Sequence, residues 1–166
     1  MSKITKTATL SNQSLQQLIN DVKQYKNNLN KGVNNGVQKA TELMYKYVKE
    51  YARSVIDNHI DEIKMEYDKT KNIGKVYTNN WVIIFNEMGT GIVGSNNPHP
   101  SPLVKNWEYD VNKHGEEGWI YPKEDGTFGR TSGLPSRQMF YKAYNQIKKE
   151  IGNIVSMEIS RKVSGY

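Results

Sequence analysis

The sequence predicts an α+β fold, with helices at both ends of the chain and short strands between them. Three observations support this prediction. Apolar residues recur every three or four positions between Ser14 and Val55, which is the helical period. From Glu62 the period changes to two, as in half-buried strands. A second helical stripe runs from Met139 to Val155.

The N-terminal helical pattern is long and weakens near its middle. Glycines at 32 and 36 interrupt it, and glycine costs about 1 kcal/mol relative to alanine inside a helix. We therefore expect either one long helix or two helices broken near Gly32–Gly36. A continuous helix over residues 14–55 would be about 60 Å long, more than a small domain needs to cover its own sheet. Residues 1–10, which precede it, are expected to form a flexible arm.

A small antiparallel sheet is expected after this helix. Ile63, Met65 and Tyr67 alternate with charged residues and predict a first strand, and residues 73–78 predict a second. The run Trp81–Phe85 fits a fully buried strand or a short buried helical turn, which periodicity does not separate. Taken as a third strand, it completes a meander with short turns.

A long loop over residues 92–118 is predicted to be inserted in this sheet, because its first part is rich in glycine, asparagine and proline. Loops of this length in a compact domain are usually functional or disordered. Trp107 and Tyr109 are its expected anchors. We expect His99 and His114, which also lie in it, to be exposed.

The rest of the chain predicts a hairpin and a final helix. Asp125-Gly126 is a typical hairpin turn between two short apolar segments. Ser136 is the expected N-cap of the helix, which we expect to pack on the sheet. Residues 160–166 are expected to form a frayed basic tail. A length of 166 residues is that of a single domain spanning 1–166.

The composition excludes several classes of protein. There is no cysteine, which excludes disulfides and thiolate chemistry. No apolar run approaches the roughly 20 residues of a membrane span, and the N-terminus lacks the apolar centre of a secretory signal. We therefore expect a protein that has no membrane contact and stays in the cytoplasm where it is made.

The formal net charge of +6 is unevenly distributed along the chain. Residues 1–80 contain 13 basic and 8 acidic residues, net +5, and residues 137–166 contain 6 and 2, net +4. Residues 81–136 contain 4 and 7, net −3. One interpretation is that lysines are scattered over solvated faces. The other is that the acidic middle of one copy faces a basic helix of the next.

Candidate catalytic and metal-binding groups are sparse. His59, Asp61 and Glu62 could ligate a metal, although such a cluster is more often a solvated helix end. Carboxylates at Glu62, Glu66 and Asp68 could bind the metals of a two-metal nuclease. The solvent-exposed face of an amphipathic strand explains their presence better. Neither a Gly-x-Ser-x-Gly elbow nor a P-loop is present. We expect no catalytic residue, no cofactor and no metal, and so no enzyme.

The basic charge permits contact with nucleic acid without indicating sequence-specific readout. Readout of bases favours arginine, and the chain has only Arg53, Arg130, Arg137 and Arg161. The tyrosines at 45, 47 and 51 could stack on bases, but the helical spacing of Tyr47 and Tyr51 is more typical of residues that pack against the sheet or a neighbour. The alternative function is thus a basic nucleic-acid-binding protein or a small metal-dependent nuclease.

Two stretches carry a resemblance to a known family. The first is an aromatic-apolar run that ends in Glu87-x-Gly89-Thr90-Gly91. The second is Gly133-Leu134-Pro135 with Met139-Phe140, at the start of the last helix. With the Trp119-x-Tyr121 hairpin between them, their order resembles the tail-component family of tailed bacteriophages, which includes tail-completion, tail-terminator and head–tail joining proteins. The resemblance covers roughly residues 12–150.

This resemblance implies a structural virion protein of the phage neck, at the top of the tail. Such a protein forms a homo-oligomeric ring, expected to be a hexamer, that completes or terminates the tail and joins it to the head connector. Its partners would be further copies of itself, the tail tube protein and head connector or adaptor proteins. Genomic DNA would pass through the lumen without sequence-specific binding. The protein would assemble in the host cytoplasm. The resemblance is consistent with a long flexible tail and with a contractile tail.

The resemblance also suggests where subunits or partners meet. A ring closes only if each subunit has two complementary faces, which the acidic middle and basic ends could supply. The residues expected at the subunit or partner interface come from the two stretches of the resemblance: Glu87, Gly89, Thr90, Gly91, Pro135, Met139 and Phe140.

Overall fold

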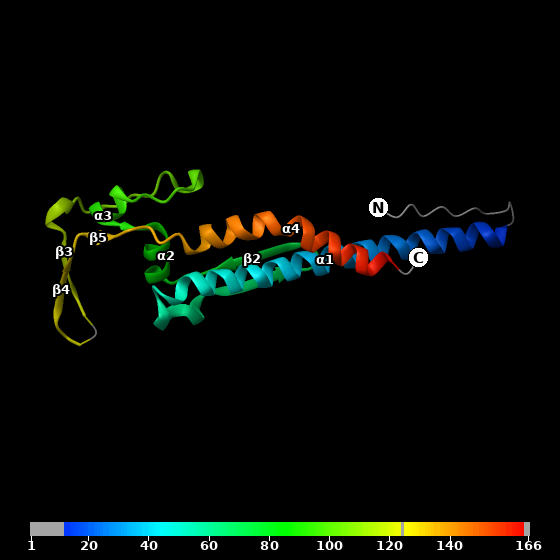
Figure 1. Ribbon diagram of the computed structural model, residues 1–166, viewed down its shortest axis with the longest axis horizontal. Coiled ribbons are helices and arrows are strands. Elements are labelled where there is room, and N and C mark those ends of the chain that lie inside the picture. The colour runs from blue at the N-terminus through cyan, green and yellow to red at the C-terminus, as the bar shows by residue number, and fades with distance from the viewer. Residues whose placement is uncertain (1–11, 124, 165–166) are drawn as a thin grey trace. The chain divides into compact units, whose positions relative to one another are not determined.

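The computed structural model describes residues 12–123 and 125–164, and its fold is α+β as expected (Figure 1). The expected arm at residues 1–10 lies outside the described part. The helices are α1 (Asn12–Arg53), α2 (Trp81–Met88), α3 (Gly91–Asn96) and α4 (Met139–Val163), with 3-10 helices η1 (Asp57–Glu62), η2 (Pro102–Val104) and η3 (Gly115–Glu117). The strands are β1 (Lys64–Asp68), β2 (Ile73–Tyr77), β3 (Trp119–Pro122), β4 (Phe128–Thr131) and β5 (Gly133–Leu134).

The described residues fall into two compact units. The first contains residues 12–43, 66–75 and 147–164, and the second contains residues 44–65 and 76–146 with the exception of residue 124. Both α1 and α4 contribute to each unit. The prediction of a single domain stays a prediction.

α1 is one unbroken helix of 42 residues, so the continuous form of the prediction is confirmed. In the first unit its two glycines lie where α4 approaches most closely. A Cβ on Gly32 would be 2.7 Å from the Cα of Ile159, and one on Gly36 would be 2.7 Å from the Cα of Val155. The glycines that weaken the helix locally are therefore the residues that let the two backbones approach each other.

Two further contacts hold the first unit together. The hydroxyl of Tyr67 on β1 lies 2.8 Å from Oδ1 of Asn34 on α1. On α4, the Glu158 carboxylate is buried and receives Lys39 Nζ at 3.3 Å and Arg161 Nη2 at 2.7 Å. Burial by itself raises the pKa of Glu158, but the hydrogen bonds from Lys39 and Arg161 outweigh it and hold that pKa below its ordinary value.

The core of the second unit joins the C-terminal part of α1 to α2 and to the start of α4. Ile83 and Met139 are almost completely buried there. Burial of such side chains stabilises the unit by about 1.5–3 kcal/mol each. The buried members of this core are Val48, Ala52, Ile56, Ile63, Ile83, Met139 and Ala143.

The run Trp81–Phe85 is helical, so its interpretation as a third, fully buried strand is wrong. The side chain of Asn80 accepts hydrogen bonds from the backbone N–H groups of Val82 and Ile83 and caps α2. Side chains two positions apart in a helix lie on different faces. Ile83 is therefore buried, while Trp81 is 64% exposed. The meander is replaced by two two-stranded sheets, β1–β2 and β3–β4.

The elements after α2 agree only in part with the predictions from the sequence. The hairpin is confirmed, with β3 and β4 antiparallel and Trp119 opposite Thr131. The predicted loop at 92–118 begins inside α3 and also contains η2 and η3. The expected fraying from residue 160 is wrong as far as Val163, where α4 ends, and residues 165–166 lie outside the described part.

Candidate functional site

The two stretches that carry the family resemblance meet in the second unit. Glu87 lies in the last turn of α2, and Gly89 is the C-cap of this helix. Thr90 and Gly91 pair as isolated bridges with Leu134 and Gly133 of β5. The contact region between residues 87–91 and 133–141 is called the Glu87 junction below. All seven residues expected at the interface lie in these two segments, and across them Glu87 bonds to Phe140 and Thr90 to Leu134 within one chain.

Glu87 caps α4 from a different element. Its Oε2 accepts a hydrogen bond from the backbone N–H of Phe140 at 2.8 Å, and its Oε1 accepts one from Tyr141 at 3.0 Å. The first N–H groups of a helix have no partner inside it, and a carboxylate there is favoured by the helix dipole. The expected N-cap is therefore wrong: the Ser136 hydroxyl instead donates to the Glu87 carbonyl at 2.7 Å.

His99 completes this arrangement and is not exposed, contrary to expectation, since its side chain is only 4% accessible. Its Nε2 lies 3.1 Å from Oε1 of Glu87, and its Nδ1 accepts the backbone N–H of Ser101 at 3.2 Å. With Nδ1 as an acceptor, Nε2 carries the proton and donates it to Glu87. The ring packs edge-on against Tyr141, with centroids 5.2 Å apart. Glu87 thus lies between an imidazole and a helix N-terminus.

The glycines of the junction are needed for close backbone approach. Gly89 and Gly91 have φ of +87° and +60°, a region that side chains with a Cβ rarely adopt. A Cβ on Gly89 would lie 2.8 Å from the backbone N of Ser136. A Cβ on Gly91 would collide with the carbonyl oxygen of Ser132. Larger residues at these positions would push the two stretches apart.

The remaining interface candidates have different environments. Met139 is buried in the core, and Phe140 packs against it while partly exposed. Pro135 is half-buried and Thr90 accepts the N–H of Leu134 at 3.2 Å through its hydroxyl. Only the partly exposed members of the set have surface to offer another chain.

The expected anchors of the loop do contact the junction. The indole N–H of Trp107 donates to the carbonyl of Gly89 at 2.9 Å. The hydroxyl of Tyr109 accepts the backbone N–H of His99 at 2.8 Å. The segment after α3 is therefore held onto the junction by aromatic side chains.

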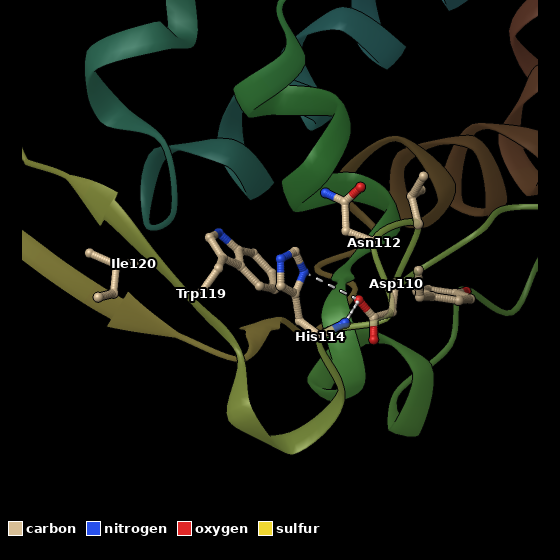
Figure 2. Close-up of a pocket in the computed structure, with 7 residues that line it drawn as sticks. Asp110, Asn112, His114, Trp119 and Ile120 are labelled. Atoms are coloured by element: carbon tan, nitrogen blue, oxygen red, sulfur yellow. Dashed lines mark hydrogen bonds and ion pairs between the residues drawn. The ribbon is translucent and has the colours of Figure 1, made fainter.

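Beside the junction, an open pocket of about 380 Å³ was not predicted from the sequence (Figure 2). His114 and Trp119 form one wall, with ring centroids 5.3 Å apart. The Asp110 carboxylate accepts the backbone N–H groups of Gly115 and His114, and these bonds lower the pKa of Asp110. In the sequence, the pocket is indicated only by the spacing of Asp110, His114 and Trp119, which lie four and five residues apart.

The pocket combines polar groups that already have partners with exposed apolar side chains. His114 Nδ1 is 3.7 Å from Oδ1 of Asp110, too far for a good hydrogen bond. Asp110 is already committed to backbone donors, whereas Val111 and Ile120 present exposed apolar side chains.

The carboxylates considered for metal do not converge on one site. Glu62 belongs to η1, so the expectation that it shares a strand face with Glu66 is wrong. Its carboxylate lies 3.0 Å from His59 Nδ1, and hydrogen bonds from Asn80 and then His59 lower the pKa of Glu62. Asp61 pairs with Lys49. Over residues 12–123 and 125–164 there is no cluster of three or more possible metal ligands.

The tyrosines at 45, 47 and 51 of α1 make contacts within the second unit. Tyr45 and Tyr47 pack against the core of the second unit. The hydroxyl of Tyr51 donates to the side chain of Gln146 on α4 at 3.1 Å. The contacts of Tyr47 and Tyr51 agree with the packing interpretation of their helical spacing.

Comparison with known proteins identified no relative: no protein-family model, curated protein or solved structure matched the chain. In the described part of the chain, no helix has both the length and the apolar character required to span a membrane.

Proposed function

We propose that the protein is a structural component of the phage neck, forming a homo-oligomeric ring that completes or terminates the tail and joins it to the head connector. One observation carries this proposal. The two stretches that resemble the tail-component family, about 45 residues apart in sequence, bond to each other through Glu87 and β5. Residues that carry a family signature are expected to share a structural task, and here they build one junction.

Exposed apolar side chains support an assembly role. In the second unit, Leu103 is 92% exposed and Phe128 73%, and Val111 and Ile120 are also exposed. Single apolar residues on a surface are ordinary, but two of these line the pocket beside the junction. A surface of this kind offers a docking place to a neighbouring subunit or to the tail tube.

The charge distribution supports contact between different faces of neighbouring copies. Residues 81–136 carry a net charge of −3 and the C-terminal 30 residues carry +4. A cyclic ring brings one face of each copy against another face of the next. Opposite charges on the two faces would guide the approach and fix its register.

The proposal is tested first on the purified wild-type protein. Light scattering over a range of concentrations should give a species of several times the monomer mass, and negative-stain images should show rings. If the protein stays monomeric, isolated tail tubes are added, because such rings can close on a partner. A monomer that also ignores tail tubes, or that binds DNA and cleaves it with a divalent metal, overturns the proposal.

The junction is tested by substitution. Glu87→Ala and Thr90→Val should disturb ring assembly or docking, because each removes a bond between the two signature stretches. Glu116→Ala is the matched control, since Glu116 is exposed on η3. Thermal unfolding of each variant separates a loss of assembly from a loss of fold. Normal assembly by both junction variants would refute the assignment of an interface to this turn.

A further inference from the structure

The β3–β4 hairpin forms a sheet of only two strands in the described part of the chain. Figure 1 shows it extending from the helices of the second unit. A two-stranded hairpin by itself is at best marginally stable in water, and a third strand or a packed helix makes such a sheet stable. The hairpin therefore has a place for one more strand.

One face of the hairpin carries exposed apolar side chains. In the register of the two strands, Ile120 lies opposite Arg130 and Pro122 lies opposite Phe128. Side chains of directly paired residues lie on the same face of a sheet. Ile120 is 69% exposed and Phe128 is 73% exposed. Because Phe128 belongs to β4, a strand added beside β4 would remove it from water.

The hydrogen bonds of the hairpin show which edge is free. The N–H of Lys123 donates to the carbonyl of Thr127 at 2.8 Å, so these two residues form a bonded pair. Bonded and non-bonded pairs alternate along an antiparallel ladder, so Phe128 and Arg130 direct their N–H and C=O groups away from β3. Among the described residues, neither N–H donates to a group outside the ladder. The corresponding edge of β3 contains Pro122, which has no N–H to offer.

A segment with the pattern of a strand precedes α1, outside the described residues. The sequence from Lys3 to Leu10 is Lys-Ile-Thr-Lys-Thr-Ala-Thr-Leu. Threonine recurs at every second position, and Ile4, Ala8 and Leu10 share the other side of an extended chain. Isoleucine and threonine are β-branched residues, which favour strands. We call residues 3–10 the N-terminal segment.

Charge and reach favour the N-terminal segment of another copy as the added strand. The segment carries two lysines and no acidic residue, whereas residues 115–131 contain four acidic and two basic residues, net −2. In its own chain, the segment would have to follow α1 back to Met44, the first residue of the second unit, 32 residues after Asn12. That is about 48 Å of helix, whereas the eleven residues before Asn12 span at most about 40 Å. The segment of another copy has no such limit.

We propose that the N-terminal segment of one copy adds to the free edge of β4 of another copy as a third, antiparallel strand. An antiparallel strand continues the β3–β4 pattern and is the more stable kind of partner. The side chains of Ile4, Ala8 and Leu10 then lie on the face of Phe128, and the N–H groups of these even-numbered residues bond to β4. The N–H groups of the threonines point away from β4.

This contact is head-to-tail, because each copy donates a strand to one neighbour and receives a strand from another. Backbone hydrogen bonds supply the affinity of an added strand, and the alternate side chains supply its specificity. The inference goes beyond the proposed function and does not depend on it.

Two proline substitutions in the full-length protein test the pairing by sedimentation. Ala8→Pro removes an N–H that bonds to β4 and should weaken self-association about tenfold. Thr7→Pro is the matched control. It removes an N–H that faces away from β4, where an edge strand tolerates proline, so association should change much less. Thermal unfolding of both variants checks that the fold is kept.

Cysteine substitutions test which strands are neighbours, since the chain has no cysteine of its own. Ala8→Cys and Phe128→Cys, made in separate chains and mixed, should give a disulfide-linked mixed dimer under mild oxidation. Thr7→Cys mixed with Phe128→Cys should give much less, because position 7 lies on the other face of the segment. A chain with both Ala8→Cys and Phe128→Cys, kept dilute, should form no internal disulfide.

The inference is overturned if the two proline variants associate equally well, or if the mixed dimer does not form. It is also overturned if the Phe128→Cys variant links only to itself, which would make β4 of another copy the added strand, or if the double variant closes within one chain. Rings that form normally from the Ala8→Pro variant would overturn this inference and leave the proposed function intact. A mixed dimer from a protein that forms no rings and ignores tail tubes would support this inference and overturn the proposed function.

Discussion

Replacing Gly36 by alanine tests whether the helix crossing in the first unit depends on close backbone approach. Two effects oppose each other. Alanine is favoured over glycine inside a helix by about 1 kcal/mol. Its methyl group, however, would lie 2.7 Å from the Cα of Val155, a backbone atom that cannot turn away. Overpacking of this kind costs about 1–3 kcal/mol, because the helices must separate and lose contacts along the crossing.

Gly152 provides the matched control. It lies inside α4, is exposed, and a Cβ there meets nothing within 4 Å. Gly152→Ala should therefore show the helix preference alone and stabilise the protein by about 1 kcal/mol. Gly36→Ala combines this gain with the clash, so we expect a change between neutral and a loss of about 2 kcal/mol. The difference between the two variants, about 1–3 kcal/mol, isolates the cost of the crossing.

The assay is urea unfolding followed by circular dichroism at 222 nm, a standard helix wavelength, with thermal unfolding beside it. A difference of about 1 kcal/mol corresponds to about 2–4 °C for a chain of this size. Gly32→Ala, with its Cβ 2.7 Å from the Cα of Ile159, should repeat the result. If Gly36→Ala stabilises the protein as much as Gly152→Ala, the crossing tolerates a methyl group and the reasoning is wrong.

Three further predictions concern single groups. Glu87→Gln offers α4 one acceptor oxygen in place of two and should lower the free energy of unfolding by about 1–3 kcal/mol, measured in urea against the exposed Glu116→Gln, which should change little. Asn80→Ala removes the N-cap of α2 and should cost about 1 kcal/mol in the same assay. The pKa of Glu158 is lowered by folding, so its contribution to stability is present above the unfolded value of 4.5 and is lost as the pH falls through the folded value. Glu158→Gln should therefore flatten the acid side of the stability profile, and an unchanged slope would refute the pairing with Lys39 and Arg161.

The long helices were predictable because their signal is local and repeated. An apolar stripe over many turns fixes a helix whatever surrounds it, and α1 and α4 follow from theirs. The β3–β4 hairpin was predictable for a similar reason, since a turn signal lies between two short strand patterns.

The short apolar run at Trp81–Phe85 was not predictable in the same way. Five consecutive apolar residues have no period, so the choice between strand and helix depends on the contacts available to the backbone. Here the Asn80 side chain supplies the first N–H groups of α2 with an acceptor. Asn80 is visible in the sequence, but the residue type alone does not show whether its side chain will cap a helix or lie in a turn between strands.

The junction illustrates the limit of sequence reasoning at a site. Glu87 could be singled out from its motif, yet its partners are the backbone N–H groups of Phe140 and Tyr141, more than 50 positions later. His99 looked like an exposed loop residue between two prolines. It became a buried donor because Tyr109, Tyr141 and Glu87 close around it.

The sequence by itself determined the α+β class, the long terminal helices, the absence of thiol chemistry and the stretches worth examining, because each depends on composition or on contacts a few residues apart. Tertiary structure alone decided that Gly32 and Gly36 lie where α1 crosses α4 and that Glu87 caps α4. It also decided that a pocket forms beside His114 and Trp119. These features depend on groups far apart in the chain, and no local pattern states which distant partner a donor, a carboxylate or a glycine will meet.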